Sequence, residues 1–473
     1  MNQKAKSVFA NISRAVSVNI LRLLISVVLT LLLPKVLGVE AFSYWQLYLF
    51  YSIYAAFSSL GWCEGVYLTY GGMNYEDLPR QKIASQFRGL LLYEIVFSIV
   101  AIAVFTSMTN NPQKKMVITL VFITTCFEIL RYSLQCTLQT TNRIKDYARL
   151  AAAERVLFFG LVILCLVLGL NNFVFIILCE TTSKFVGLIY VTYVCRDIVF
   201  VKNVTISKII IESKKMISIG FKMLCAILAS QLILGIVRFA IENKWGTIAF
   251  GRISLTLSFA NMIITAISAI SIVIFPILKQ MDREKSKDFY AVVRTNLLLP
   301  LLFVLNFYPV IFMLLKWWLP QYADSLKYLA ILLPLCIYES RNLILTDTYF
   351  KAYRKTELVL MINIATIAMS ATFTAISVYI MESVDFAVIS IVLLLFFKSL
   401  LSEIILNRYT NQFYLPDIFA EAALCAVYIY SNWFLNHGLS AVIYPLTFIM
   451  YLLIKRKKFV ELLKEARSVF GES

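Results

Sequence analysis

The sequence predicts an all-α membrane protein that crosses the bilayer many times, and three observations lead to this prediction. Of its 473 residues, 60% are hydrophobic and only 15% are charged, whereas soluble domains have about 45–50% apolar and about 25% charged residues. Apolar runs of about 20 residues, long enough to span the hydrocarbon core, recur along the whole chain. Lys and Arg gather in alternate connections between these runs, as they do in cytoplasmic loops.

Fourteen apolar runs are expected to form transmembrane helices joined by short connections. The basic stretch "MNQKAKSVFANISRAV" precedes the first run, and no small-residue cleavage site ends that run, so it is interpreted as a first membrane helix rather than a signal peptide. The runs cover residues 15–34, 44–70, 88–108, 116–139, 148–169, 172–195, 217–241, 248–277, 293–316, 326–350, 357–380, 385–406, 416–435 and 439–455.

The distribution of basic residues predicts that both termini lie in the cytoplasm. With the N-terminus inside, the inner segments hold about 30 Lys and Arg residues and the outer turns hold about 6, which is the asymmetry expected between the cytoplasmic and outer loops of a membrane protein. The outer residues are Lys35, Lys114, Lys115, Lys244, Lys316 and Lys327.

Composition also argues against other classes of function. The net charge of +17 follows from basic cytoplasmic loops, and no soluble segment carries the basic stripe with interleaved aromatics that nucleic-acid binding requires. The nine cysteines lie in or beside apolar runs without CxxC spacing, so free thiols are expected. The single histidine, His437, falls in a short turn. We therefore expect no metal site and no cofactor.

The chain repeats a local pattern at an offset of 208 residues, which predicts two related halves. In "LLPKVLGVEAFSYWQL" and "AIENKWGTIAFGRISL" an apolar run ends, turns at a glycine and restarts with an Ala-Phe step. Gly38 matches Gly246, and Arg14 matches Lys222 at the same offset. We expect an N-lobe at 1–200, a C-lobe at 201–410 and two further helices with a basic amphipathic tail at 411–473. Transporters are often built from such repeats, with the substrate path between them. One side of the tail carries Phe459, Leu462, Leu463, Ala466 and Phe470, and a membrane-surface helix and a solvated helix are both compatible with it.

Several charged residues inside the predicted spans have an obvious way to offset the cost of burial. Two pairs are spaced to share one helical face and are expected to form internal ion pairs: Glu128 with Arg131, and Glu180 with Lys184. Others lie close enough to a span end to reach the interface: Lys222, Arg252, Glu154 and Glu421.

Arg22 and Arg238 differ from these residues because each lies inside the first helix of its lobe. Arg22, in "SVNILRLLISVV", has no acidic residue three or four positions away, and Arg238 has only Glu242. An unpaired arginine within a span needs an anion or water. A pair between Arg22 and Glu64 across helices is the competing interpretation, and the sequence leaves both open.

The phrases "LPKVLGVEAFSYWQLY" and "SSLGWCEGVYLTYGG", together with fourteen spans in two halves, resemble the bacterial polysaccharide flippase family. The resemblance runs along nearly the whole chain, and its motifs are loose patterns of glycine and aromatic residues. That family belongs to the superfamily that also holds multidrug and toxin extruders and the lipid II flippase. The resemblance implies two lobes around a central cavity in the bacterial inner membrane. It also implies export of O-antigen or capsular repeat units on undecaprenyl pyrophosphate by alternating access. It also implies membrane-lipid contacts and work beside a polysaccharide polymerase and chain-length machinery.

If the resemblance holds, the arginines inside the spans suit a pyrophosphate head group, because guanidinium groups bind phosphate through paired hydrogen bonds. The expected head-group contacts are Arg22, Arg238, Arg341 and Lys398. Glu64, between Gly61 and Gly65, and Asp347 are expected to act in gating or cation coupling. No GxxxxGK[ST] pattern is present, so ATP is not expected to drive transport directly. Coupling to H⁺, Na⁺ or the membrane potential remains open.

Two other functions were weighed. A cation-coupled multidrug extruder of the same superfamily is less favoured, because the first helix has no acidic residue between Arg14 and Pro34 and an arginine there repels a cationic drug. A membrane polysaccharide polymerase is also less favoured, because the outward connections are short and carry no cluster of Asp, Glu or His suited to acid–base chemistry. The sequence therefore favours a transporter that is not an enzyme.

Overall fold

The computed structural model describes the backbone of residues 3–202, 204–410, 415–435 and 437–471. Side chains of 1–18, 269–273, 275–277, 279–280, 283, 288, 437 and 457–471 lie outside the description. The described residues are mostly helical and contain no strand, which confirms the all-α membrane class. Eleven helical stretches of this part of the chain are long and apolar enough to cross a membrane. Two of them each cover most of two predicted spans, and α17 (Leu415–Phe434) coincides with one more.

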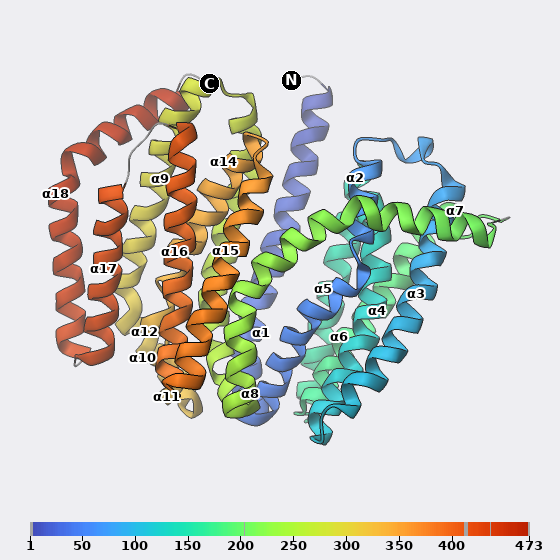
Figure 1. Ribbon diagram of the computed structural model, residues 1–473, viewed down its shortest axis with the longest axis horizontal. Helices are drawn as coiled ribbons and strands as arrows, with labels where there is room; N and C mark the ends of the chain where they lie inside the picture. The colour runs from blue at the N-terminus through green and yellow to red at the C-terminus, as the bar shows by residue number, and fades with distance from the viewer. Residues whose placement is uncertain (1–2, 203, 411–414, 436, 472–473) are drawn as a thin grey trace. The chain divides into compact units, whose positions relative to one another are not determined.

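The first compact unit comprises Met1–Leu228. Its helix α4 is the most enclosed of the unit's spans and contacts α1, α2, α3, α5 and α6, so this helix forms the centre of the unit. The elements are α1 (Gln3–Ala55), η1 (Ala56–Ser59), α2 (Trp62–Tyr70), η2 (Tyr75–Asp77), α3 (Arg80–Ser107), α4 (Pro112–Thr140), α5 (Ile144–Val167), α6 (Phe173–Val194), α7 (Arg196–Val199) and the first part of α8 (Ile206–Gln280) (Figure 1).

The second compact unit comprises Ala229–Ser473 and includes the last two long helices. The stretch Leu329–Ala352 is its most enclosed span. The elements after α8 are α9 (Arg283–Val304), η3 (Leu305–Phe307), α10 (Tyr308–Trp318), η4 (Pro320–Tyr322), α11 (Ala323–Leu326), α12 (Leu329–Leu332), α13 (Leu335–Ser340), η5 (Arg341–Thr346), α14 (Asp347–Ala352), α15 (Thr356–Thr374), η6 (Ala375–Ile380), α16 (Val384–Thr410), α17 and α18 (His437–Gly471).

The boundary between the units falls later than the sequence suggested. The prediction ended the first lobe at residue 200, whereas the first unit continues to Leu228. The reason is local packing, since Met216 and Gly220 of α8 lie directly against glycines of α2 and the preceding turn. The tail expected to be amphipathic belongs to the end of α18, and its side chains are among those not described.

The repeated glycine turn is confirmed in both halves. Gly38 interrupts α1 with φ 74° and ψ 175°, and Gly246 interrupts α8 with φ 80° and ψ 178°. This region of backbone space is essentially restricted to glycine. Each glycine therefore lets one membrane helix end and the next begin without an intervening loop, which explains why the same residue occurs at both positions.

Candidate functional site

Arg22 lies in α1, ahead of the glycine turn, and is half-buried. Its Nε is buried and has no hydrogen-bond partner among the described residues. Within the same part of the chain no carboxylate forms an ion pair with it, and Glu64 Oε2 is likewise buried without a hydrogen-bond partner. The pair between Arg22 and Glu64, which the sequence left open, is therefore not formed in this structure.

Arg238 occupies the corresponding helix of the second half, before the Gly246 turn. Its Nη2 donates a hydrogen bond to Ser254 Oγ at 2.9 Å, and its guanidinium lies 5.0 Å from the ring centroid of Phe250. Both partners follow the Gly246 turn, so the two arms of α8 on either side of that turn lie side by side here. The side chain is half-buried. Ser254 takes one of the five N–H donors that an arginine carries.

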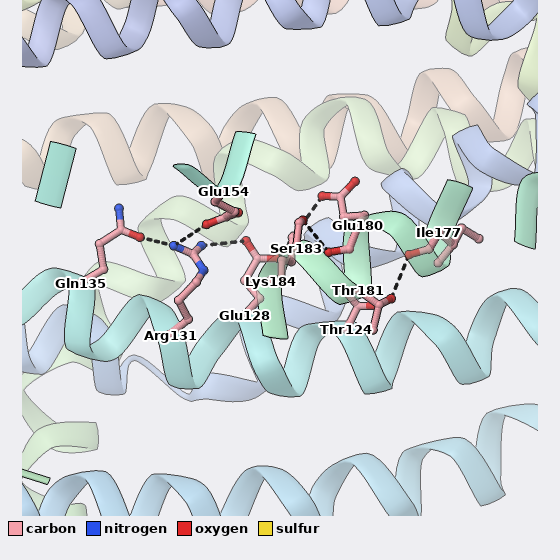
Figure 2. Close-up of polar contacts among 10 residues, drawn as sticks. All are labelled: Thr124, Glu128, Arg131, Gln135, Glu154, Ile177, Glu180, Thr181, Ser183 and Lys184. Carbon is pink, nitrogen blue, oxygen red and sulfur yellow. Dashed lines mark hydrogen bonds and ion pairs between the residues drawn. The ribbon is translucent and has the colours of Figure 1, made fainter. Parts of the chain in front are cut away.

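An ionic network that is buried except at Glu128, whose side chain is 34% exposed, joins three helices of the first unit (Figure 2). Both pairs expected within single helices are present. Arg131 Nη2 lies 3.9 Å from Glu128 Oε1, and Lys184 Nζ lies 3.2 Å from Glu180 Oε1. Lys184 of α6 also pairs with Glu128 of α4. These contacts link α4 to α6 directly, a connection that helical spacing alone does not reveal.

Glu154 completes this network and corrects a prediction. It was expected to reach the interface from the end of its span, but its side chain is buried on α5 and pairs with Arg131 Nη1 at 3.0 Å. Arg131 also donates to Gln135 one turn further along α4. The network thus contains three carboxylates and two basic groups, and its shared partners tie α4, α5 and α6 together.

A second ionic network lies in the second unit and is more deeply buried. Arg294 of α9 forms a bidentate ion pair with Glu421 of α17, in which Nη1 and Nη2 each lie 3.0 Å from one carboxylate oxygen. Its Nε lies 3.5 Å from Glu403 Oε1 of α16. Arg341 of η5 pairs with both carboxylates, its Nε lying 3.2 Å from Glu403 Oε1. Two arginines and two glutamates, each with at most 4% of its side chain exposed, therefore neutralise one another.

This second network differs from two expectations. Arg341 was expected to contact a head group, yet it is fully buried between two carboxylates at the start of a π-helical turn. Glu421 was expected to reach the interface, yet it is buried, as is its partner Arg294. The physical reason is that charges on different helices find one another in the core, where an unpaired charge is costly.

Lys398 also differs from its expected role as a head-group contact. It is buried on α16, and its Nζ lies 3.9 Å from Glu339 Oε2 of α13. Asp347, at the start of α14, is half-buried and interacts electrostatically with Lys398, Lys351 and Glu339. The sequence correctly singled out these charges as unusual, but the structure groups Lys398 with acidic neighbours.

Two carboxylates inside the predicted spans of the first unit have no basic partner within the described residues. Glu64 is half-buried on α2, beside glycines at which backbones approach closely. Glu94 of α3, to which the sequence assigned no role, is fully buried and accepts a hydrogen bond from Ser58 Oγ at 3.2 Å. Its signal in the sequence was a glutamate in the middle of an apolar run with no basic residue one turn away.

The arrangement separates structural charges from available ones. In the two networks each basic group already contacts carboxylates, which suits them to holding helices together. Arg22, by contrast, presents a guanidinium that no described carboxylate neutralises. An anion is the natural ligand for such a group, because hydrogen bonds between ionised partners are the strong ones.

Comparison with known proteins gives the fold a context. No family model and no curated protein matches the sequence. Among solved structures, the lipid II flippase MurJ in an inward closed conformation is similar with a TM-score of 0.66 and 11% identity, covering 95% of this chain and 100% of that one. An inward-facing multidrug resistance MATE family transporter of the MOP superfamily is similar with a TM-score of 0.63 and 12% identity, covering 86% and 99%.

A third similar structure is a MOP superfamily transporter from Pyrococcus furiosus, with a TM-score of 0.50, 14% identity, and coverage of 87% of this chain and 96% of that one. The chain has the fold of these membrane transporters. The likeness spans nearly the full length of each, and the low identity limits what it shows to the fold.

Proposed function

We propose that this protein is a flippase that moves undecaprenyl-pyrophosphate-linked oligosaccharide units from the cytoplasmic to the outer leaflet of the bacterial cytoplasmic membrane. The units would serve O-antigen or capsule synthesis. The observation that carries the proposal is Arg22, a half-buried guanidinium inside a membrane helix without a carboxylate partner among the described residues. The fold, which is that of membrane transporters, supports the same interpretation.

The chemistry of Arg22 favours a phosphorylated ligand. Arginine keeps its charge under all physiological conditions, and its planar fork fits two phosphate oxygens at once. A permanent positive charge in this position disfavours an organic cation and favours an anion. Pyrophosphate supplies closely spaced anionic oxygens, whereas a neutral sugar supplies none.

Arg238 is proposed as a second contact for the same head group. It stands at the matching place in the second half, before the matching glycine turn, and Ser254 and Phe250 fix its orientation. Because Arg341 and Lys398 are already paired with carboxylates, we do not assign them to the head group. Transport is proposed to couple to H⁺, Na⁺ or the membrane potential, with Glu64 and Asp347 as the coupling carboxylates.

The experiment is complementation of a strain from which the gene is deleted. We expect Arg22→Ala to lose most of the surface glycan and to accumulate lipid-linked units at the inner face, and Arg22→Lys to retain a part because it keeps the charge without the fork. Arg149→Ala is the matched control, since Arg149 is an exposed arginine on α5. All variants are compared at equal protein level in the membrane.

Other outcomes would redirect the proposal. Full surface glycan in both Arg22 variants would remove the head-group contact. Short glycans outside the cell in the deletion strain would indicate a polymerase. Unchanged glycans together with new drug sensitivity would indicate a multidrug extruder.

A further inference from the structure

The first part of α8 runs in a different direction from the helices that it contacts. Residues 206–222, here called the α8 entry segment, run across the ends of α2 and α3 beside α7, rather than along the spans of the first unit (Figure 1). Lys208 Nζ donates to Gln81 Oε1 at 3.4 Å, so the segment lies where α3 begins. The basic residues of that end predict that it faces the cytoplasm.

Glycine contacts set the rotation of the entry segment about its own axis. A Cβ on Gly220 would collide with the backbone of Gly61, and a Cβ on Gly65 would collide with the backbone of Met216. Gln86 of α3 also donates to Glu212 Oε2 at 3.1 Å. Met216 and Gly220 therefore face α2, and the residues that point elsewhere are determined by helical geometry.

One of the remaining sides of the entry segment is apolar and exposed. Ile206, Ile210 and Phe221 recur at helical spacing, so they form one stripe, whereas Ile217 packs against the core of the first unit. Ile206 is 76% exposed, Ile210 is 50% exposed and Phe221 is 49% exposed. A stripe of this kind is unfavourable in water, and the described residues leave about half or more of each of these three side chains uncovered. Hydrocarbon at the edge of a bilayer would cover it.

Lysines flank and oppose this apolar stripe. Lys214 lies beside it on the helix surface, and Lys208 and Lys215 lie on the opposite side, seven residues apart. All three are exposed. A helix with an apolar stripe, bordering lysine and an opposite basic face has the pattern of helices that lie in the interface of an anionic membrane.

We infer that the α8 entry segment is a membrane-surface element, which buries Ile206, Ile210 and Phe221 at the acyl boundary while its lysines bind the anionic phospholipid head groups of the cytoplasmic leaflet. The charge complementarity is direct, because that leaflet carries anionic lipid and attracts basic segments near the membrane surface. The close contacts of Gly61 and Gly65 with Gly220 and Met216 fix the rotation of the segment, so that the apolar stripe faces the lipid. This inference does not depend on which molecule is transported.

The test is hydrogen–deuterium exchange of the full-length protein in nanodiscs of phosphatidylcholine with and without phosphatidylglycerol. Amides of 206–216 should exchange more slowly in the anionic discs, by about fivefold for each lysine that engages the surface. Lys214→Gln with Lys215→Gln should reduce the difference between the two lipid compositions to the part that Lys208 contributes, at most about fivefold. Ile206→Asn with Ile210→Asn should speed exchange in both compositions.

The matched control removes two positive charges elsewhere. Lys351→Gln with Lys355→Gln changes two exposed lysines of the second unit and should leave exchange of 206–216 as in the wild type. Equal exchange in both lipid compositions for the wild-type protein would overturn the inference, as would a lipid effect that is undiminished after removal of Lys214 and Lys215. The measurement needs no transport, so its failure would not be mistaken for failure of the proposed function.

Discussion

The buried network of the second unit gives the sharpest structural prediction. Arg341 is enclosed by Glu403 and Glu421, and both carboxylates also contact Arg294. Arg341→Met keeps much of the side-chain volume and removes the charge. The four-residue network then passes from neutral to a net charge of minus one in a site with almost no exposure.

The magnitude follows from which contacts survive. Glu421 keeps two contacts of 3.0 Å with Arg294, so it remains paired. Glu403 loses the 3.2 Å contact with Arg341 and keeps only the 3.5 Å contact with Arg294. Removing one partner of a buried ion pair costs about 3–5 kcal/mol. For a unit of this size each kcal/mol shifts Tm by about 2–4 °C, so a fall of about 6–20 °C is expected.

The assay is thermal unfolding of the purified protein in nanodiscs, followed by a double-mutant cycle. Glu403→Gln added to Arg341→Met removes the excess negative charge and should restore more than half of the lost stability. Arg408→Met, at an exposed position of α16, is the control and should change stability by less than about 0.5 kcal/mol. The reasoning is refuted if Arg341→Met lowers Tm by less than about 2 °C, or if the two changes simply add.

Three further predictions concern single contacts. Gly246→Ala should lower the stability by about 1–3 kcal/mol through backbone strain alone, because nothing lies within 4 Å of the added Cβ. Gly160→Ala, inside a regular helix, is the control and should not destabilise the protein. Thermal unfolding compares the two variants. Lys184→Met should destabilise the first unit by about 3–5 kcal/mol. Neutralising Glu128 or Glu180 in addition should recover part of the lost stability. An absence of recovery would mean that the network does not contribute. Lys244 Nζ lies 2.5 Å from Glu382 Oε1 and holds the pKa of Glu382 below its usual value. The stability that this ion pair contributes is therefore present at neutral pH and is lost as the pH falls through that lowered pKa. Lys244→Gln should return the pKa of Glu382, read by NMR, to about 4.3.

The sequence predicted the fold well because the signals that decide it are local. An apolar run of sufficient length is a span wherever it packs, and a glycine followed by Ala-Phe marked the two turns at Gly38 and Gly246. Their backbone angles agree within a few degrees, although few residues around them are identical. The extension of the first compact unit to Leu228 depends on glycine contacts of α8 with α2, which lie far apart in the sequence and leave no local signal.

The ionic partners were predicted only where both lie on one helix. The spacing of Glu128 and Arg131 made their pairing visible, whereas Glu154 reaches Arg131 from another helix. The same limit hid the partners of Arg341, because Glu403 and Glu421 come from two later helices. Helical periodicity says which face a charge occupies, but it does not say which helix lies opposite that face.

The central claim is that Arg22 binds the phosphorylated head of a lipid-linked substrate. The most direct measurement is the rate at which purified protein in proteoliposomes flips a fluorescent undecaprenyl-pyrophosphate-linked oligosaccharide, compared between wild type and Arg22→Ala. Loss of a hydrogen bond to a charged group is worth about 1.5–3 kcal/mol, so the rate at subsaturating substrate should fall about 10- to 150-fold. An unchanged rate in Arg22→Ala, with the variant folded and correctly inserted, would contradict the claim.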